Sequence, residues 1–127
     1  AYQLKDFYDE THLLCPMIDA RRMEVYCQIL DNQMNVISET EAKIINDSSF
    51  SKILNEKKIV FFGDGATKCR AEISHKNAVF LNTEIHPSAK TVGLVATKSY
   101  EKSLFENVVT FEPFYLKDFV GTQPKKV

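Results

Sequence analysis

The stretch Lys58-Ile59-Val60-Phe61-Phe62-Gly63-Asp64-Gly65 decides how the rest of the sequence is interpreted. Its first five residues are β-prone and almost entirely apolar, which is typical of an interior strand covered on both faces. The two glycines end the strand abruptly, and residues 66–73 are compatible with a helix. The segment therefore predicts a buried strand, a tight turn and a helix, as expected in an α/β or α+β layered domain.

Three antiparallel strands are predicted upstream of this segment. Residues 13–20 form a short apolar run, and residues 23–30 alternate apolar and polar side chains, as in a strand with one buried face. Residues 19–22 are polar and short enough for a tight hairpin. Residues 31–33 supply a second turn before a third strand, which we place within residues 36–45.

Helices are predicted on both sides of the buried strand. The polar residues 47–49 are suitable N-caps, and Phe50, Ile53 and Leu54 follow at the spacing of a helix that buries one side. Residues 78–81 form a short strand or a buried connection. Pro87 is suited to the first position of a longer helix, whose small and apolar residues predict close packing through to about Ser103.

The C-terminal segment is expected to complete a single domain. Residues 108–116 are too aromatic for a solvated end and are predicted to dock on the core, and residues 121–127 are predicted to fray. We therefore expect one domain over residues 1–120. It has a mixed sheet with three antiparallel strands first, followed by a helix, a strand, a helix and a longer helix.

Composition excludes several classes of protein. Of the 127 residues, 44% are hydrophobic and 26% are charged, as in soluble globular proteins, and the apolar runs are too short to cross a bilayer. The net charge of -1 gives no general electrostatic reason to bind nucleic acid. Cys15, Cys27 and Cys69 form no C-x-x-C pair, so we expect packing residues in a reducing cytoplasm.

Two segments are candidate binding sites. Gly63, Gly65 and Ala66 could let the backbone approach the base or sugar of a nucleotide, although a plain tight turn needs the same residues. The predicted hairpin places Asp19, Arg21 and Arg22 together, and Glu24 extends this polar patch along the next strand. The hairpin is either an interaction surface for a carboxylate, phosphate or protein, or a solvated turn.

No catalytic or metal site is predicted. His12, His75 and His86 are spread over the chain without H-x-x-x-H or H-E-x-x-H spacing. Ser48, Ser49 and Ser51 have the setting of helix caps and lack that of a G-x-S-x-G nucleophile.

Several segments together resemble the C-terminal half of the TsaB (YeaZ) family, in the glycoprotease-like branch of the actin-like ATPase superfamily. They occur in the family's order and span nearly the whole chain. They are Met17-Ile18-Asp19-Ala20-Arg21-Arg22-Met23-Glu24-Val25-Tyr26, Val60-Phe61-Phe62-Gly63-Asp64-Gly65-Ala66, Pro87-Ser88-Ala89, and Phe111-Glu112-Pro113-Phe114-Tyr115-Leu116-Lys117-Asp118-Phe119.

The resemblance implies a ribonuclease-H-like half domain whose N-terminal half, with its D-T-A-T-like and G-P-G-S-F-T-like segments, is absent here. It implies a non-catalytic scaffold subunit of the bacterial machinery that makes N6-threonylcarbamoyladenosine in tRNA. The expected partners are TsaD, the metal-dependent catalytic relative, and TsaE, with tRNA reached indirectly and self-association into a homodimer as a further expectation. It also implies that ATP or ADP binds only with the absent half or a partner.

Two alternatives of a different class stay open. One is a glycoprotease-type metallopeptidase acting on peptides or glycoproteins, which the older name of the family suggests. The other is a stand-alone nucleotide-binding module that uses residues 63–66.

Overall fold

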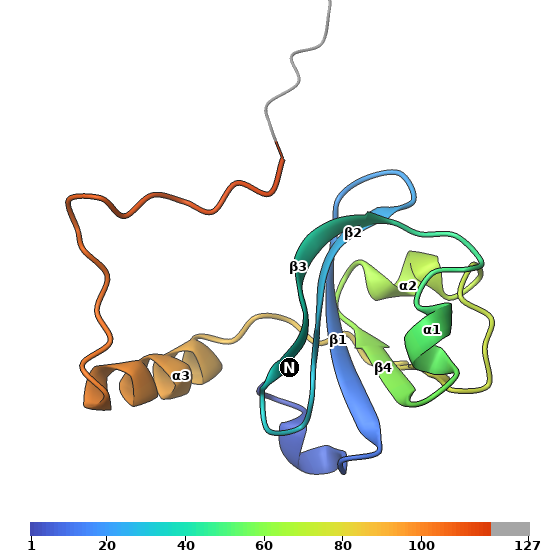
Figure 1. Ribbon diagram of the computed structural model, residues 1–127, viewed down its shortest axis with the longest axis horizontal. Helices are drawn as coiled ribbons and strands as arrows, with labels where there is room; N and C mark the ends of the chain where they lie inside the picture. Colours follow the sequence, from blue (N-terminus) through green and yellow to red (C-terminus); the bar gives the residue numbers. More distant parts are fainter. Residues whose placement is uncertain (118–127) are drawn as a thin grey trace, which may run out of the picture.

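A computed structural model describes residues 1–117 and shows a five-stranded mixed sheet in the order β3-β2-β1-β4-β5 (Figure 1). Strands β1, β2 and β3 are antiparallel, whereas β4 runs parallel to both β1 and β5. This arrangement confirms the predicted mixed sheet and is consistent with a ribonuclease-H-like half domain. The strands are β1 (His12–Asp19), β2 (Glu24–Leu30), β3 (Val36–Ile44), β4 (Lys58–Phe62) and β5 (Ala78–Phe80).

Strand β4 is the interior strand that its sequence predicts. Residues 59–62 are all buried, because β1 and β5 flank the strand and both of its faces are covered. One face packs in the main core with β1, β2 and two short helices, α1 (Ser51–Leu54) and α2 (Ala66–Cys69). On the other face, Val60 and Phe62 join Leu14 beneath the N-terminal segment, which contains the 3-10 turn η1 (Lys5–Phe7).

The two predicted helices beside β4 are each only one turn long. Helix α1 begins after Phe50, which adopts a left-handed conformation with φ 64°. The Ser49 hydroxyl accepts a hydrogen bond from the Asn46 amide at 2.9 Å, so this serine stabilises the preceding turn instead of capping a longer helix. Helix α2 ends at Cys69, and the predicted extension to Ile73 is wrong because the chain turns there.

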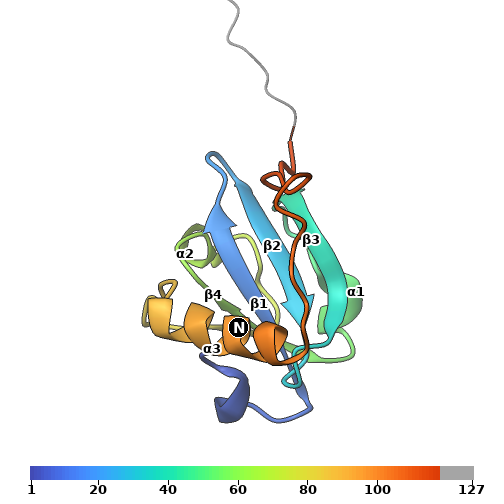
Figure 2. The ribbon, with the colours of Figure 1, turned by 90° about the vertical axis from the view of Figure 1, so that its left-hand side faces the viewer.

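The predictions for the C-terminal third are wrong about packing. Helix α3 (Ala89–Glu101) starts after Ser88, two residues later than predicted, and all of its residues are at least partly exposed. The predicted docking of residues 108–116 on the core is also wrong, since Val108 and Val109 are about nine-tenths exposed. We call residues 89–117 the arm; Figure 1 shows α3 standing apart from the sheet, and Figure 2, turned by 90°, shows the helix in front of the strands.

The remaining predictions concern the cysteines, the end of the domain and membrane-spanning segments. Cys15, Cys27 and Cys69 are buried free thiols, as predicted. The predicted domain end at residue 120 and the fraying of residues 121–127 fall outside the described residues. Within residues 1–117, no helix combines the length and apolar character needed to cross a bilayer.

Candidate functional site

The β1–β2 hairpin brings together the four polar residues that the sequence singled out. Arg21 and Arg22 lie at its tip with positive φ angles of 66° and 46°, and both side chains are exposed. The Asp19 carboxylate accepts a hydrogen bond from the Arg21 backbone amide at 2.6 Å. Asp19 thus stabilises the turn, which leaves the two arginines as the solvent-facing part of the patch.

Lys68 is a contact of this hairpin that sequence reasoning missed. Its ammonium group lies 2.7 Å from each of three oxygens, namely Asp19 Oδ1 and the carbonyl oxygens of Arg22 and Glu24. Lys68 belongs to α2, so this one side chain ties α2 to both strands of the hairpin. The Lys68 hydrogen bond, followed by that from the Arg21 amide, lowers the pKa of Asp19.

Substitution of Lys68 by methionine is expected to destabilise the domain by about 1–2 kcal/mol, because two carbonyl groups lose a charged donor. Asp19 makes a further contribution to the free energy of unfolding, and this contribution depends on pH. Its pKa is lowered in the folded state, so its contribution is complete above the unfolded pKa of about 3.9 and is lost as the pH falls through the folded value.

Urea unfolding of the wild-type and Lys68→Met proteins at pH 7 and pH 3 measures both contributions of Lys68 to stability, through the two carbonyl groups and through Asp19. The exposed Lys76→Met variant is the matched control and should match the wild type. A difference between the wild type and Lys68→Met that does not shrink at low pH would remove the role assigned to Asp19.

Glu24 is also engaged within the chain. Its carboxylate forms an ion pair with Lys117 at the end of the arm, and the Lys117 ammonium lies 5.9 Å from the centre of the Tyr26 ring. Of the four predicted interaction residues, Asp19 and Glu24 therefore have internal partners, and Arg21 and Arg22 face solvent.

The glycine turn after β4 lets the backbone pack closely against the end of β1. Gly63 has φ +97°, and a Cβ atom there would lie 2.3 Å from the Met17 carbonyl oxygen. The Gly65 amide donates a hydrogen bond to that same oxygen at 3.2 Å, and both Gly65 and Ala66 are buried against the end of β1. These contacts account for both glycines without a ligand.

A cavity of about 270 Å³ lies beside this turn, at the carboxyl ends of β1 and β4. In open α/β sheets, ligands favour the carboxyl ends of strands at a point where the chain leaves in opposite directions. The cavity is bordered by Gly63, Asp64 and His86, and the Gln3 amide donates a 2.8 Å hydrogen bond to the His86 carbonyl oxygen. Of the three residues predicted to contact a nucleotide, only Gly63 borders it.

The three histidines lie apart, each with a local partner. His12 Nδ1 lies 2.9 Å from the Asp9 carboxylate, His75 Nδ1 accepts the Asn77 amide at 3.1 Å, and His86 lies 3.2 Å from Glu84. In the part of the chain that the structure describes, no three His, Cys, Asp or Glu side chains are grouped so that they could hold a metal ion.

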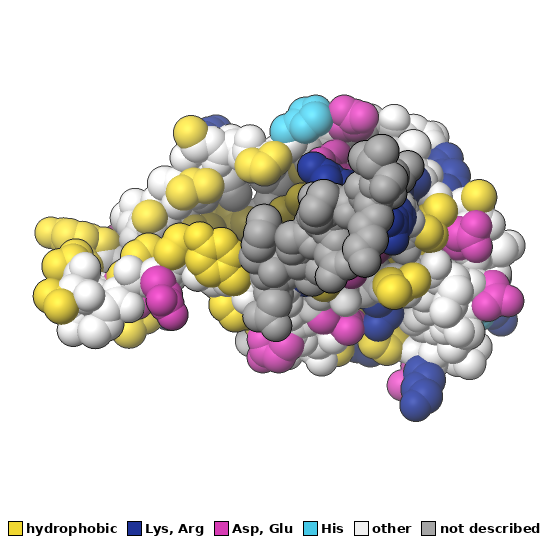
Figure 3. All heavy atoms as spheres, turned by 90° about the horizontal axis from the view of Figure 1, so that it is seen from above, with side chains coloured by type: hydrophobic (Ala, Val, Ile, Leu, Met, Phe, Trp, Pro, Cys, Tyr) yellow, Lys and Arg dark blue, Asp and Glu magenta, His cyan; other side chains and the backbone are white. Residues whose placement is uncertain are grey.

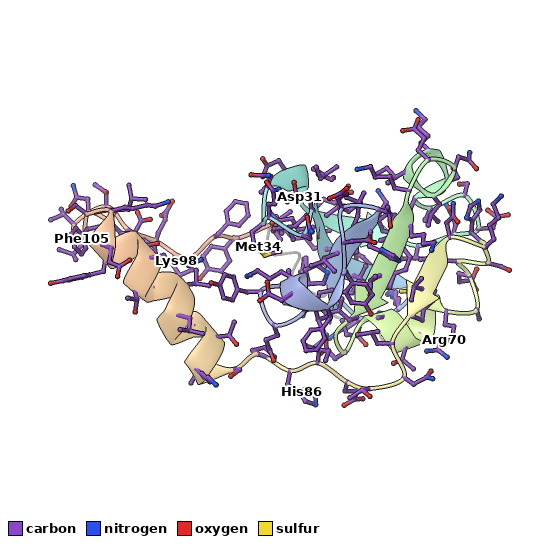
Figure 4. The ribbon with its side chains drawn as sticks, turned by 90° about the horizontal axis from the view of Figure 1, so that it is seen from below. Asp31, Met34, Arg70, His86, Lys98 and Phe105 are labelled. Carbon is purple, nitrogen blue, oxygen red and sulfur yellow. The ribbon has the colours of Figure 1, made fainter. Side chains whose placement is uncertain are left out.

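A second concavity, which we call the basic groove, lies between α3 and the β2–β3 turn. It has a volume of about 480 Å³, and Lys98 of α3 points toward the turn that carries Asp31 and Met34 (Figure 4). Its lining residues are Tyr2, Lys5, Asn32, Gln33, Met34, Val95, Lys98, Ser99, Lys102 and Leu104. The sequence signal for it is the spacing of Lys98 and Lys102, four residues apart at the C-terminal end of α3.

The arm carries most of the large exposed apolar side chains. Figure 3 shows hydrophobic side chains gathered over it. Tyr100 and Phe105 pack edge to face at 5.6 Å, beside a hollow of about 650 Å³ formed by residues 96–106. The exposed arm residues are Val92, Leu94, Val95, Tyr100, Leu104, Phe105, Val108, Val109, Phe111, Phe114 and Tyr115.

No family model and no curated protein matches the chain.

Proposed function

We propose that this domain is a non-catalytic scaffold that binds a protein partner, and that the partner is TsaD in the bacterial complex that makes N6-threonylcarbamoyladenosine in tRNA. The proposal that the surface binds protein is carried by the apolar surface of the arm. The choice of complex is supported by the motif order described above, together with a fold consistent with a ribonuclease-H-like half domain. The proposal places the domain in the cytoplasm, with TsaE as a further partner.

The size of the apolar surface favours a protein partner. Five aromatic side chains of the arm are between 64% and 79% exposed, namely Tyr100, Phe105, Phe111, Phe114 and Tyr115. At roughly 150–250 Å² per aromatic side chain, they present on the order of 500–900 Å². A stable protein interface covers about 800 Å² of each partner, and larger exposed apolar patches mark interaction sites.

The hollow beside Phe105 gives this surface a shape that a partner side chain can fill. Interfaces draw most of their affinity from a few aromatic or arginine side chains packed in such hollows. Tyr100 holds the Phe105 ring in place from one side. We therefore place the centre of the interface at the end of α3.

Binding of the full chain to purified TsaD, measured by calorimetry, tests the proposal. Phe105→Asp is expected to weaken binding by about 30-fold or more, as for the loss of a hot-spot residue. The control is Phe7→Asp, because Phe7 is an exposed phenylalanine on η1, outside the arm; it is 79% exposed against 67% for Phe105. Well-folded wild-type proteins that do not associate, or equal losses in both variants, would contradict the proposal.

A stand-alone nucleotide-binding module is a second candidate, favoured by the cavity at the ends of β1 and β4. Calorimetry of the full chain with ADP tests it. Micromolar binding that is weakened by Asp64→Ala, and unchanged by Phe105→Asp, would support this function.

A further inference from the structure

The basic groove combines positive charge with an aromatic ring. Lys5 comes from η1, Lys98 from the last turn of α3 and Lys102 from the C-cap of that helix, so segments distant in sequence bring three ammonium groups to one hollow. The Lys98 and Lys5 ammonium groups lie 4.8 Å and 5.5 Å from the centre of the Tyr2 ring. Among the described residues that line the groove, none carries a carboxylate.

The carboxylates nearest to the groove are directed elsewhere. Asp6 forms an ion pair with Lys5 and neutralises it. Asp31 accepts hydrogen bonds from the backbone amides of Gln33 and Asn35 at 2.9 Å and 2.8 Å. The hydrogen bond with the Asn35 side chain is the largest of the effects that lower the pKa of Asp31. Glu101 precedes Lys102 but lies about 100° away around the helix.

Among residues 1–117, no carboxylate forms an ion pair with Lys98 or Lys102, so these two lysines supply the remaining positive charge of the groove. Lys98 lies in the last turn of α3 and Lys102 is its C-cap, so two like charges four residues apart repel each other at the end of the helix. An anion that contacts both ammonium groups removes this repulsion. The side chains of Asn32, Gln33 and Ser99 add hydrogen-bonding groups around the same hollow.

We propose that the basic groove binds a single-stranded segment of RNA, with successive phosphates at Lys98 and Lys102 and a nucleoside that takes the place of the Lys98 ammonium group over the Tyr2 ring. Proteins that bind single strands combine a positively charged groove with an aromatic platform. The aromatic ring and the amide side chains favour RNA over an acidic peptide, which would use the lysines alone. The choice of tRNA as the source of the strand rests on the proposed function, whereas RNA binding by the groove does not.

Fluorescence anisotropy with an unmodified tRNA transcript and the full chain, between 50 and 200 mM salt, tests this proposal. Lys98→Glu/Lys102→Glu is expected to lower the affinity at least tenfold and to reduce the slope of log affinity against log salt by about 1.4, at roughly 0.7 for each lost contact. The matched control is Lys76→Glu/Lys90→Glu, which changes the charge equally at two exposed residues outside the groove. It should alter the affinity less than threefold.

A second pair of variants tests the aromatic part. Tyr2→Ala should weaken RNA binding about tenfold, since loss of one stacked base costs roughly 1–3 kcal/mol, while Tyr2→Phe should retain it. Unchanged binding by Tyr2→Ala would overturn the role of the ring.

The remaining outcomes separate this proposal from its competitors. Equal losses in both double variants would show non-specific attraction and overturn the proposal. Competition by polyglutamate as strong as competition by unlabelled tRNA would overturn it in favour of an acidic protein segment, and absence of wild-type binding would overturn it outright. RNA binding that persists in a protein unable to bind TsaD would support the groove as an RNA site and contradict only the proposed function.

Discussion

Replacement of Gly63 by alanine is expected to lower the free energy of unfolding by about 3–5 kcal/mol, a large part of the 5–15 kcal/mol that is typical of a domain. Two effects contribute. A side chain at φ +97° is strained, which costs on the order of 1–3 kcal/mol. The new Cβ atom would also lie 2.3 Å from the Met17 carbonyl oxygen, so the backbone of β1 or of the turn must move.

Two other glycines serve as controls for the loss of stability expected of Gly63→Ala. At Gly65 a Cβ atom would lie 2.9 Å from the Ile18 carbonyl carbon with ordinary φ, so Gly65→Ala should cost less, about 1–3 kcal/mol. A Cβ at Gly93 meets nothing within 4 Å, and Gly93→Ala should leave the free energy of global unfolding unchanged, because α3 contains no buried residue. Urea unfolding of the three variants gives the order. If Gly63→Ala were as stable as Gly93→Ala, the close approach to Met17 would be refuted.

Replacement of Phe61 by alanine is expected to cost a similar amount, about 3–5 kcal/mol. The Phe61 side chain is 0% exposed at the centre of the sheet. Its ring stacks on Phe80 at 4.9 Å and packs against Phe50 at 5.2 Å, so its loss leaves a cavity between β4, β5 and the start of α1.

The control for Phe61 is the same substitution at an exposed ring. Phe7→Ala removes an equal volume from a side chain that is 79% exposed, and its effect should stay within about 0.5 kcal/mol. Thermal and urea unfolding of both variants measure the difference. A small loss for Phe61→Ala would mean that the neighbouring rings collapse into the space, which a gain in ring contacts by NMR would reveal.

The strands could be predicted because their patterns reflect burial directly. An apolar run such as residues 58–62 needs cover on both faces, and the alternation of residues 23–30 needs cover on one. The third strand was harder to delimit, because β3 lies at the edge of the sheet and its middle, Ser38-Glu39-Thr40-Glu41, is polar.

The helices and the site were predicted less well, for two physical reasons. Apolar spacing indicates that a surface is to be covered but does not identify the element or partner that covers it. The spacing in α3 therefore predicts packing within the domain, whereas the structure shows an exposed arm. Side chains such as Lys68, Lys5 and Lys98 acquire their roles only through contacts with residues far away in the chain. The glycine turn was recognised correctly, but its backbone partner, Met17, cannot be identified from spacing.

The separation of α3 from the sheet has a consequence for how the domain unfolds. A 13-residue helix with no buried residue is marginal in water, so its amide hydrogens should exchange with solvent far faster than those of β1 and β4. Global melting then reports on the sheet alone and is insensitive to the state of the arm. A partner that covers the arm would slow exchange in α3 while leaving the protection of the sheet unchanged, so hydrogen exchange can follow partner engagement residue by residue.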